Sequence, residues 1–194
     1  MWRFTILLLM VIAICLIPEP ANANAGVPMI FVTLPWMLVA LIPVILLEGL
    51  IMARRHTLSY LRAGKIMGLA NAVSTIFGVP LTWGILLGVQ ILTGGGSSHG
   101  MDGTLDRFLA VTWQAPWLVP YESELYWMIP AAFLFLSVPF FLASWFIETF
   151  IARKMAADIP LPALRRSVLN ANLVSYCLID AAVIIAAIMF HQAG

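Results

Sequence analysis

Four long stretches of the chain are apolar and almost free of charge. They run over residues 29–53, 66–92, 128–152 and 168–190, with boundaries good to a few residues. Because a bilayer core of about 30 Å takes about 20 apolar residues per helix, each stretch is long enough to cross a membrane. The pattern therefore predicts an all-α, polytopic membrane protein whose four transmembrane helices form two tandem hairpins joined by a middle loop.

Composition narrows the class of protein further. Of 194 residues, 62% are hydrophobic and only 10% are charged, whereas a soluble domain carries roughly 25% charged residues. A soluble globular enzyme is therefore excluded, and the lipid bilayer is the first expected partner. The net charge of +1 does not suggest a nucleic-acid partner.

The first 25 residues have the features of a secretory signal peptide. Arg3 precedes an apolar core, and Ala23-Asn24-Ala25 matches an A-x-A cleavage site. We expect cleavage after Ala25; the alternative is an uncleaved anchor. The predicted organisation is then a signal peptide at 1–25, a first hairpin at 26–92, an extracytoplasmic loop at 93–127 and a second hairpin at 128–194.

Loop charges predict the orientation. The turns inside the two hairpins are rich in arginine and lysine, and only Asp158 is acidic there; the middle loop carries Arg107 against four acidic residues. By the positive-inside rule, the two turns are cytoplasmic and the middle loop is outside. Both mature termini would then be extracytoplasmic, in a bacterial plasma membrane.

The middle loop has two parts. Gly94–Ser98 reads as a flexible linker, and apolar residues from Leu105 to Trp113 recur at near-helical spacing, which predicts a short helix on the membrane surface. Aromatic residues follow, and we expect them to anchor the loop at the lipid interface rather than to bind a ligand: Trp113, Trp117, Tyr121, Tyr126 and Trp127.

The two hairpins resemble each other. Glu48 precedes Asn71 by 23 positions, and Glu148 precedes Asn172 by 24; each asparagine is followed three residues later by a serine, Ser74 or Ser175. Because both halves run out-in-out, the pattern indicates a parallel internal repeat. The alternative is chance resemblance between apolar helices.

Ionisable residues inside a span are costly, and each is a functional hypothesis. Glu48 and Glu148 could pair with nearby arginines, or each could accept a hydrogen bond from the asparagine of the following helix and so staple its hairpin. We favour the staple over an ion site. Asp180 lies near the middle of the last span and continues a polar stripe from Asn172 and Tyr176. Packing in an oligomer and a proton or ion site are both open for it.

The second span carries a stripe of small and polar residues at spacings of three and four. Such stripes allow close helix approach, so this face is expected to meet another helix, from this chain, from a second copy or from another membrane protein. Its members are Gly64, Gly68, Asn71, Thr75, Gly78 and Thr82.

No enzymatic motif is present. The chain lacks a phosphate loop, a G-x-S-x-G elbow and an H-E-x-x-H motif. Its histidines and its two cysteines are scattered, so no metal, haem or other cofactor is expected. We predict that the protein is not an enzyme.

Three segments resemble the filament-integrity membrane proteins of cyanobacteria, the FraC type. They are residues 42–49, which read Ile-Pro-Val-Ile-Leu-Leu-Glu-Gly, and residues 71–78 and 170–176, which contain the Asn-x-x-Ser pairs. The resemblance implies a non-enzymatic plasma-membrane protein at cell septa that supports filament integrity and cell–cell exchange. The residues it carries over are structural: Glu48, Asn71, Ser74, Gly78, Asn172 and Ser175.

Two function classes follow. The first is a structural or assembly protein that packs through its helix faces. The second is a small proton- or ion-coupled transporter or channel that uses Asp180 with Glu48 and Glu148.

Overall fold

The computed structural model describes residues 26–94 and 101–193. The expected signal peptide and all but the first residue of the expected Gly94–Ser98 linker lie outside these residues. Within them the fold is all-α, and four helical segments are long and apolar enough to cross a membrane. The prediction of four spanning helices is therefore confirmed, and it places the protein in a membrane.

The first hairpin contains α2 (Met29–His56) and a second span made of α3 (Tyr60–Val73), η1 (Ser74–Gly78) and α4 (Val79–Leu92). The second hairpin contains α6 (Leu125–Met155) and α7 (Leu161–Ala193). The helices extend beyond the apolar stretches, chiefly toward the two arginine-rich turns, whose non-helical residues are 57–59 and 156–160 and whose arginines and lysines lie on the flanking helix ends. Hydropathy marks only the part of a helix that matches the bilayer core, so it misses these polar ends.

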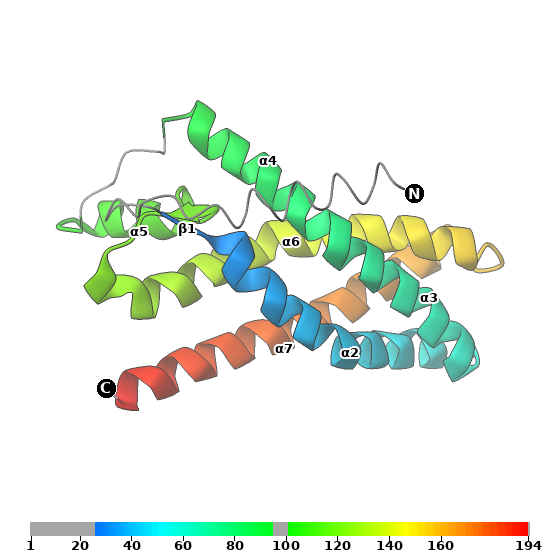
Figure 1. The fold of residues 1–194 in the computed structure, drawn as a ribbon. Coiled ribbons are helices and arrows are strands. Elements are labelled where there is room, and N and C mark those ends of the chain that lie inside the picture. The colour runs from blue at the N-terminus through cyan, green and yellow to red at the C-terminus, as the bar shows by residue number, and fades with distance from the viewer. Residues whose placement is uncertain (1–25, 95–100, 194) are drawn as a thin grey trace, which may run out of the picture.

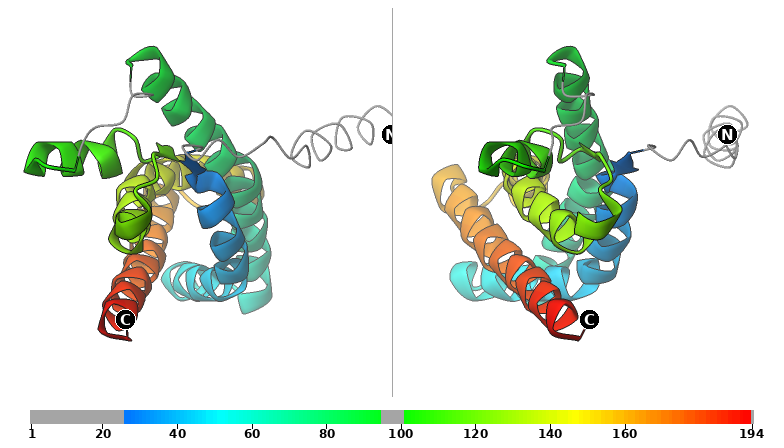
Figure 2. Two further views of the ribbon diagram at one scale, coloured as in Figure 1. Left: turned by 60° about the vertical axis from the view of Figure 1, so that its left-hand side comes forward. Right: turned by 90° about the vertical axis from the view of Figure 1, so that its left-hand side faces the viewer.

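The four spans pack in a ring. α2 lies beside α3 and α7, and α6 lies beside α7 and α3. Both arginine-rich turns lie at one end of the bundle, which we call the basic end (Figure 1). Away from this end the helices diverge, and α4 and α7 finish on opposite sides of the molecule (Figures 1 and 2).

The second span is not a continuous α-helix. Its middle, Ser74–Gly78, winds as a single π-helical turn, and Pro80 follows in the first turn of α4. Proline lacks the N–H that would bond four residues back, and π turns of this kind are frequent at functional sites. Here the turn places Ser74 and Thr75 at the centre of the bundle, where both are buried.

Two hydrophobic clusters lie at different levels of the bundle. The cluster at the basic end includes Met52, Met67 and Leu164. The cluster toward the other end includes Met29, Val79 and Leu136 and extends into the middle loop. Between the two clusters the helices pass through a layer in which the buried side chains are polar, among them Glu48, Ser74 and Glu148.

The middle loop folds against the diverging end. It contains α5 (Thr104–Thr112), a short 3-10 helix (η2, Glu122–Glu124) and a two-residue strand, β2 (Trp117–Leu118), which pairs antiparallel with β1 (Val27–Pro28). The Gln90 side chain, from α4, donates to the Trp117 carbonyl (3.0 Å) and accepts from the Trp117 N–H (3.1 Å). The expected surface helix corresponds to α5. The strand pair was not predicted, since two residues give no readable alternation.

Candidate functional site

Each hairpin contains a hydrogen bond between its glutamate and its asparagine. The Asn71 Nδ2 donates to Glu48 Oε2 at 2.6 Å, and the Asn172 Nδ2 donates to Glu148 Oε2 at 2.6 Å. The first bond joins α2 to α3, and the second joins α6 to α7. These are the staple contacts expected from the sequence.

Two further hydrogen bonds cross between the hairpins. The Ser175 Oγ donates to Glu48 Oε1 at 2.6 Å, and the Ser74 Oγ donates to Glu148 Oε1 at 2.8 Å. Each carboxyl group therefore accepts one amide donor from its own hairpin and one hydroxyl donor from the other. The pattern is therefore symmetric: Glu48, Asn71 and Ser74 of the first hairpin make the same kinds of bonds as Glu148, Asn172 and Ser175 of the second. We call these six side chains the carboxyl network.

The helical backbone orients the donors in the same way in both halves. Each asparagine amide also donates to the carbonyl four residues earlier, of Met67 (3.0 Å) or Val168 (3.1 Å). Each serine lies three residues after its asparagine, on the same helix face. The serine hydroxyl also lies 3.1 Å from the main-chain carbonyl oxygen of that asparagine. The Asn-x-x-Ser spacing therefore aims two donors at two different carboxyl groups.

The carboxyl network is removed from solvent and lipid. Glu48 and Glu148 are each 1% exposed, and the other four members are at most 3% exposed. Among the residues that the structure describes, no lysine, arginine or histidine takes part in the hydrogen bonds that these six side chains make. Because a buried polar group without a partner is costly, these bonds favour a helix arrangement in which each carboxyl oxygen has a donor.

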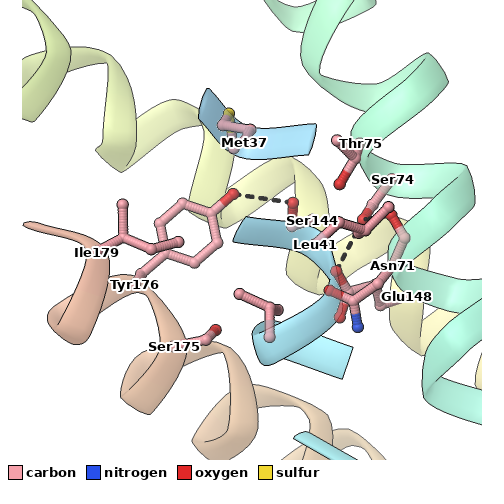
Figure 3. Close-up of a pocket in the computed structure, with 11 residues that line it drawn as sticks. Met37, Leu41, Asn71, Ser74, Thr75, Ser144, Glu148, Ser175, Tyr176 and Ile179 are labelled. Atoms are coloured by element: carbon pink, nitrogen blue, oxygen red, sulfur yellow. Dashed lines mark hydrogen bonds between the residues drawn. The ribbon is translucent and has the colours of Figure 1, made fainter. Parts of the chain in front are cut away.

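A small cavity adjoins the network (Figure 3). Its volume is about 20 Å³, and Ser74, Thr75, Ser144, Glu148 and Tyr176 supply polar lining. A polar cavity of that size can hold a single water molecule. Figure 3 shows the Tyr176 hydroxyl reaching across from α7 toward Ser144, to which it is hydrogen-bonded at 3.0 Å.

Asp180 lies apart from the network, nearer the diverging end. Its Oδ2 accepts a hydrogen bond from the Ser137 Oγ at 3.2 Å, and its Oδ1 is buried without a hydrogen-bond partner in the described part of the chain. The predicted stripe of Asn172, Tyr176 and Asp180 therefore faces α6, but each member has a different partner there. The Asn172 Oδ1 is likewise buried and unpartnered among the described residues.

The small-residue stripe of the second span is divided between different neighbours. A Cβ atom on Gly78 would lie 2.6 Å from Ile147 Cδ1 of α6, and one on Gly68 would lie 3.7 Å from Ile45 Cγ2 of α2. A Cβ on Gly49 would lie 3.4 Å from Gly64 Cα, so α2 and α3 approach closely there. The stripe thus packs largely within the chain. Thr82 is half-buried, and a Cβ on Gly64 would meet nothing within 4 Å.

The basic end has its own polar contacts between the hairpins. The Arg62 Nη2 lies 2.5 Å from Asp158 Oδ1, and His56 Nε2 lies 2.7 Å from the Ser167 Oγ. The hydrogen bond from Arg62 holds the pKa of the Asp158 carboxyl below its usual value. Both contacts join the first hairpin to the second at the basic end.

Three features of the site were not foreseen from the sequence: the serine bonds between hairpins, Ser144 and Ser137. The signal for the two α6 serines was present, because Ser137, Ser144 and Glu148 follow at spacings of seven and four and so share one helix face. The bonds between hairpins had no such signal, since they depend on how the hairpins pack.

Within residues 26–94 and 101–193, no three His, Cys, Asp or Glu side chains come together as a metal site would require. Comparisons with protein-family models, curated proteins and solved structures find no match for this chain.

Proposed function

We propose that the protein is a non-enzymatic structural or assembly protein of the membrane, whose two hairpins the carboxyl network locks into one unit. The observation that carries this proposal is the reciprocal pattern of four hydrogen bonds. Each glutamate uses both oxygens to hold donors from two other helices. A carboxyl group whose two oxygens both accept hydrogen bonds from neighbouring helices supports a fixed helix arrangement rather than a moving one.

The cavity beside the network favours the same function. At about 20 Å³ it has room for a water molecule but not for a hydrated ion. The exchange symmetry of the hydrogen bonds supports a second part of the proposal, that the two hairpins arose as a parallel repeat.

The biological setting that we propose rests on the resemblance to filament-integrity proteins of the FraC type. In that setting the chain, exported by a cleaved signal peptide, sits in the plasma membrane with its termini outside, gathers at cell septa and supports connection between neighbouring cells. Its partners would be other septal membrane proteins or further copies of itself.

Imaging tests the setting. A fluorescent protein that folds outside the cytoplasm, fused to the C-terminus, is expected to concentrate at septa in the native host. An even distribution around the cell membrane, or a unicellular source, would remove the septal proposal and leave only the structural one.

Asp180 is the specific observation behind a second candidate, a proton- or ion-coupled transporter. A buried carboxyl oxygen without a partner is the kind of group that proton pathways use. The substitution Asp180→Asn separates the two functions. A transporter should lose flux while remaining folded, whereas a structural protein should keep its activity, or lose it together with its ability to assemble.

A further inference from the structure

A groove on the outer side of the second hairpin is not part of the carboxyl network. It has a volume of about 310 Å³ and lies where the end of α6 meets the start of α7, at the basic end. Its apolar lining includes Phe146, Phe150 and Leu161, which are 74%, 55% and 46% exposed. All three belong to helices that can cross a membrane, so this part of the groove faces lipid chains.

Two arginines line the same groove. The guanidinium of Arg165 lies 4.6 Å from the centre of the Trp145 ring, and Arg153 Nη1 donates to the carbonyls of Ile159 (3.1 Å) and Ala157 (3.4 Å). A third cation, Lys154, lies over the Phe150 ring at 4.3 Å. These contacts hold the positive charges beside the groove before any ligand binds.

The positive charge at the groove has no acidic residue beside it in the lining. No aspartate or glutamate of residues 26–94 and 101–193 lines the groove. The nearest acids in the sequence are Glu148, which belongs to the carboxyl network, and Asp158, which is paired with Arg62 of the first hairpin. The groove is also lined by Thr149, whose Oγ1 is buried without a hydrogen-bond partner in the described ranges.

We propose that this groove binds an anionic phospholipid. The arginines would hold the phosphate, because guanidinium groups bind phosphate oxygens in a bidentate manner. An acyl chain would lie along Phe146 and Phe150. Phe146 and Arg153 are separated by two turns of α6, about 10 Å along the helix, so a headgroup and its chain can reach both.

Native mass spectrometry of the full chain in mild detergent tests the proposal. Phosphatidylglycerol and phosphatidylcholine are added in equal amounts, and the bound lipid is counted. We expect one tightly retained phosphatidylglycerol. The double variant Arg153→Gln/Arg165→Gln should retain it about thirtyfold less strongly, because each basic group near a membrane surface contributes roughly a fivefold factor.

The matched control is Arg54→Gln/Lys65→Gln, which removes the same charge at the same end of the bundle but outside the groove. It should retain phosphatidylglycerol to within about threefold of the unmodified chain. Equal loss in both variants, or equal retention of the two lipids, would overturn the proposal. Competition by free glycerol 3-phosphate would also overturn it, since the site would then recognise soluble phosphate.

The variant Arg165→Gln covers the case in which the double variant does not fold, because Arg153 also caps backbone carbonyls. The Arg165 side chain is exposed, and its loss should weaken retention about fivefold without changing helicity. Unchanged retention in a folded Arg165→Gln protein would contradict the proposal.

Discussion

The Ser175 hydroxyl donates a 2.6 Å hydrogen bond to Glu48, a residue 127 positions earlier in the chain. Its counterpart, from Ser74 to Glu148, spans 74 positions. Together these two bonds join the hairpins at the level between the two hydrophobic clusters. Lipid offers no hydrophobic force that would drive helices together, so polar contacts and close packing must specify their arrangement.

Glu148 should tolerate glutamine better than alanine. Glutamine keeps one acceptor oxygen for the Asn172 amide and an amide group that can donate to the Ser74 oxygen, whereas alanine leaves both partners unsatisfied. Both substitutions remove the carboxyl group, so their difference reports the hydrogen bonds together with the packing of the side chain. We expect Glu148→Ala to be less stable than Glu148→Gln by about 2 kcal/mol, measured as free energy of unfolding in detergent. Equal stabilities would show that the network contributes little.

Close approach of α2 and α3 depends on Gly49. A leucine there would force the backbone of Gly64 away, and overpacking of this kind costs about 1–3 kcal/mol. The control is Gly84→Leu, because a Cβ on Gly84 of α4 would meet nothing within 4 Å. Thermal unfolding should show a clear loss for Gly49→Leu and almost none for Gly84→Leu. Similar losses at the two glycines would mean that the helices do not meet at Gly49.

The ion pair between Arg62 and Asp158 predicts a pH dependence. The pKa of Asp158 in the folded protein lies below its usual value. The contribution of the ionised Asp158 to the free energy of unfolding is therefore present above the unfolded-state pKa and is lost as pH falls through the folded-state pKa. At neutral pH the unmodified chain should therefore be slightly more stable than Asp158→Asn. This difference should disappear once the pH is below the folded pKa of Asp158. The pair is exposed, so the effect is small and should also weaken with salt.

Much of the fold follows from hydropathy, and the rest depends on tertiary contacts. Twenty-residue apolar stretches predict spans because the bilayer fixes their length, and the Asn-x-x-Ser pairs give one partner for each glutamate. The π turn at Ser74–Gly78 was not predicted, although Pro80 marks the place. The hydrogen bonds between the hairpins, from Ser175 to Glu48 and from Ser74 to Glu148, were also not predicted. Sequence spacing does not say which helices are neighbours in the ring.

The Asp180 environment illustrates the same limit. Its position in the last span made it a candidate from the sequence, but its partner, Ser137, lies 43 positions away on another helix. The groove that we propose for a phospholipid is likewise formed by residues from the end of α6 and the start of α7. Only the fold shows that these charges and rings share one surface.

The central claim, that the carboxyl network locks the two hairpins together, is tested most directly by a double-mutant cycle on Ser175 and Glu48. The variants are Ser175→Ala, Glu48→Ala and their combination, compared by free energy of unfolding in a membrane-like environment. The structure predicts a coupling energy of about 1 kcal/mol, since either single substitution already breaks the bond. A coupling of zero would contradict the claim, because the two residues would then contribute independently and the hairpins would be held together by other contacts.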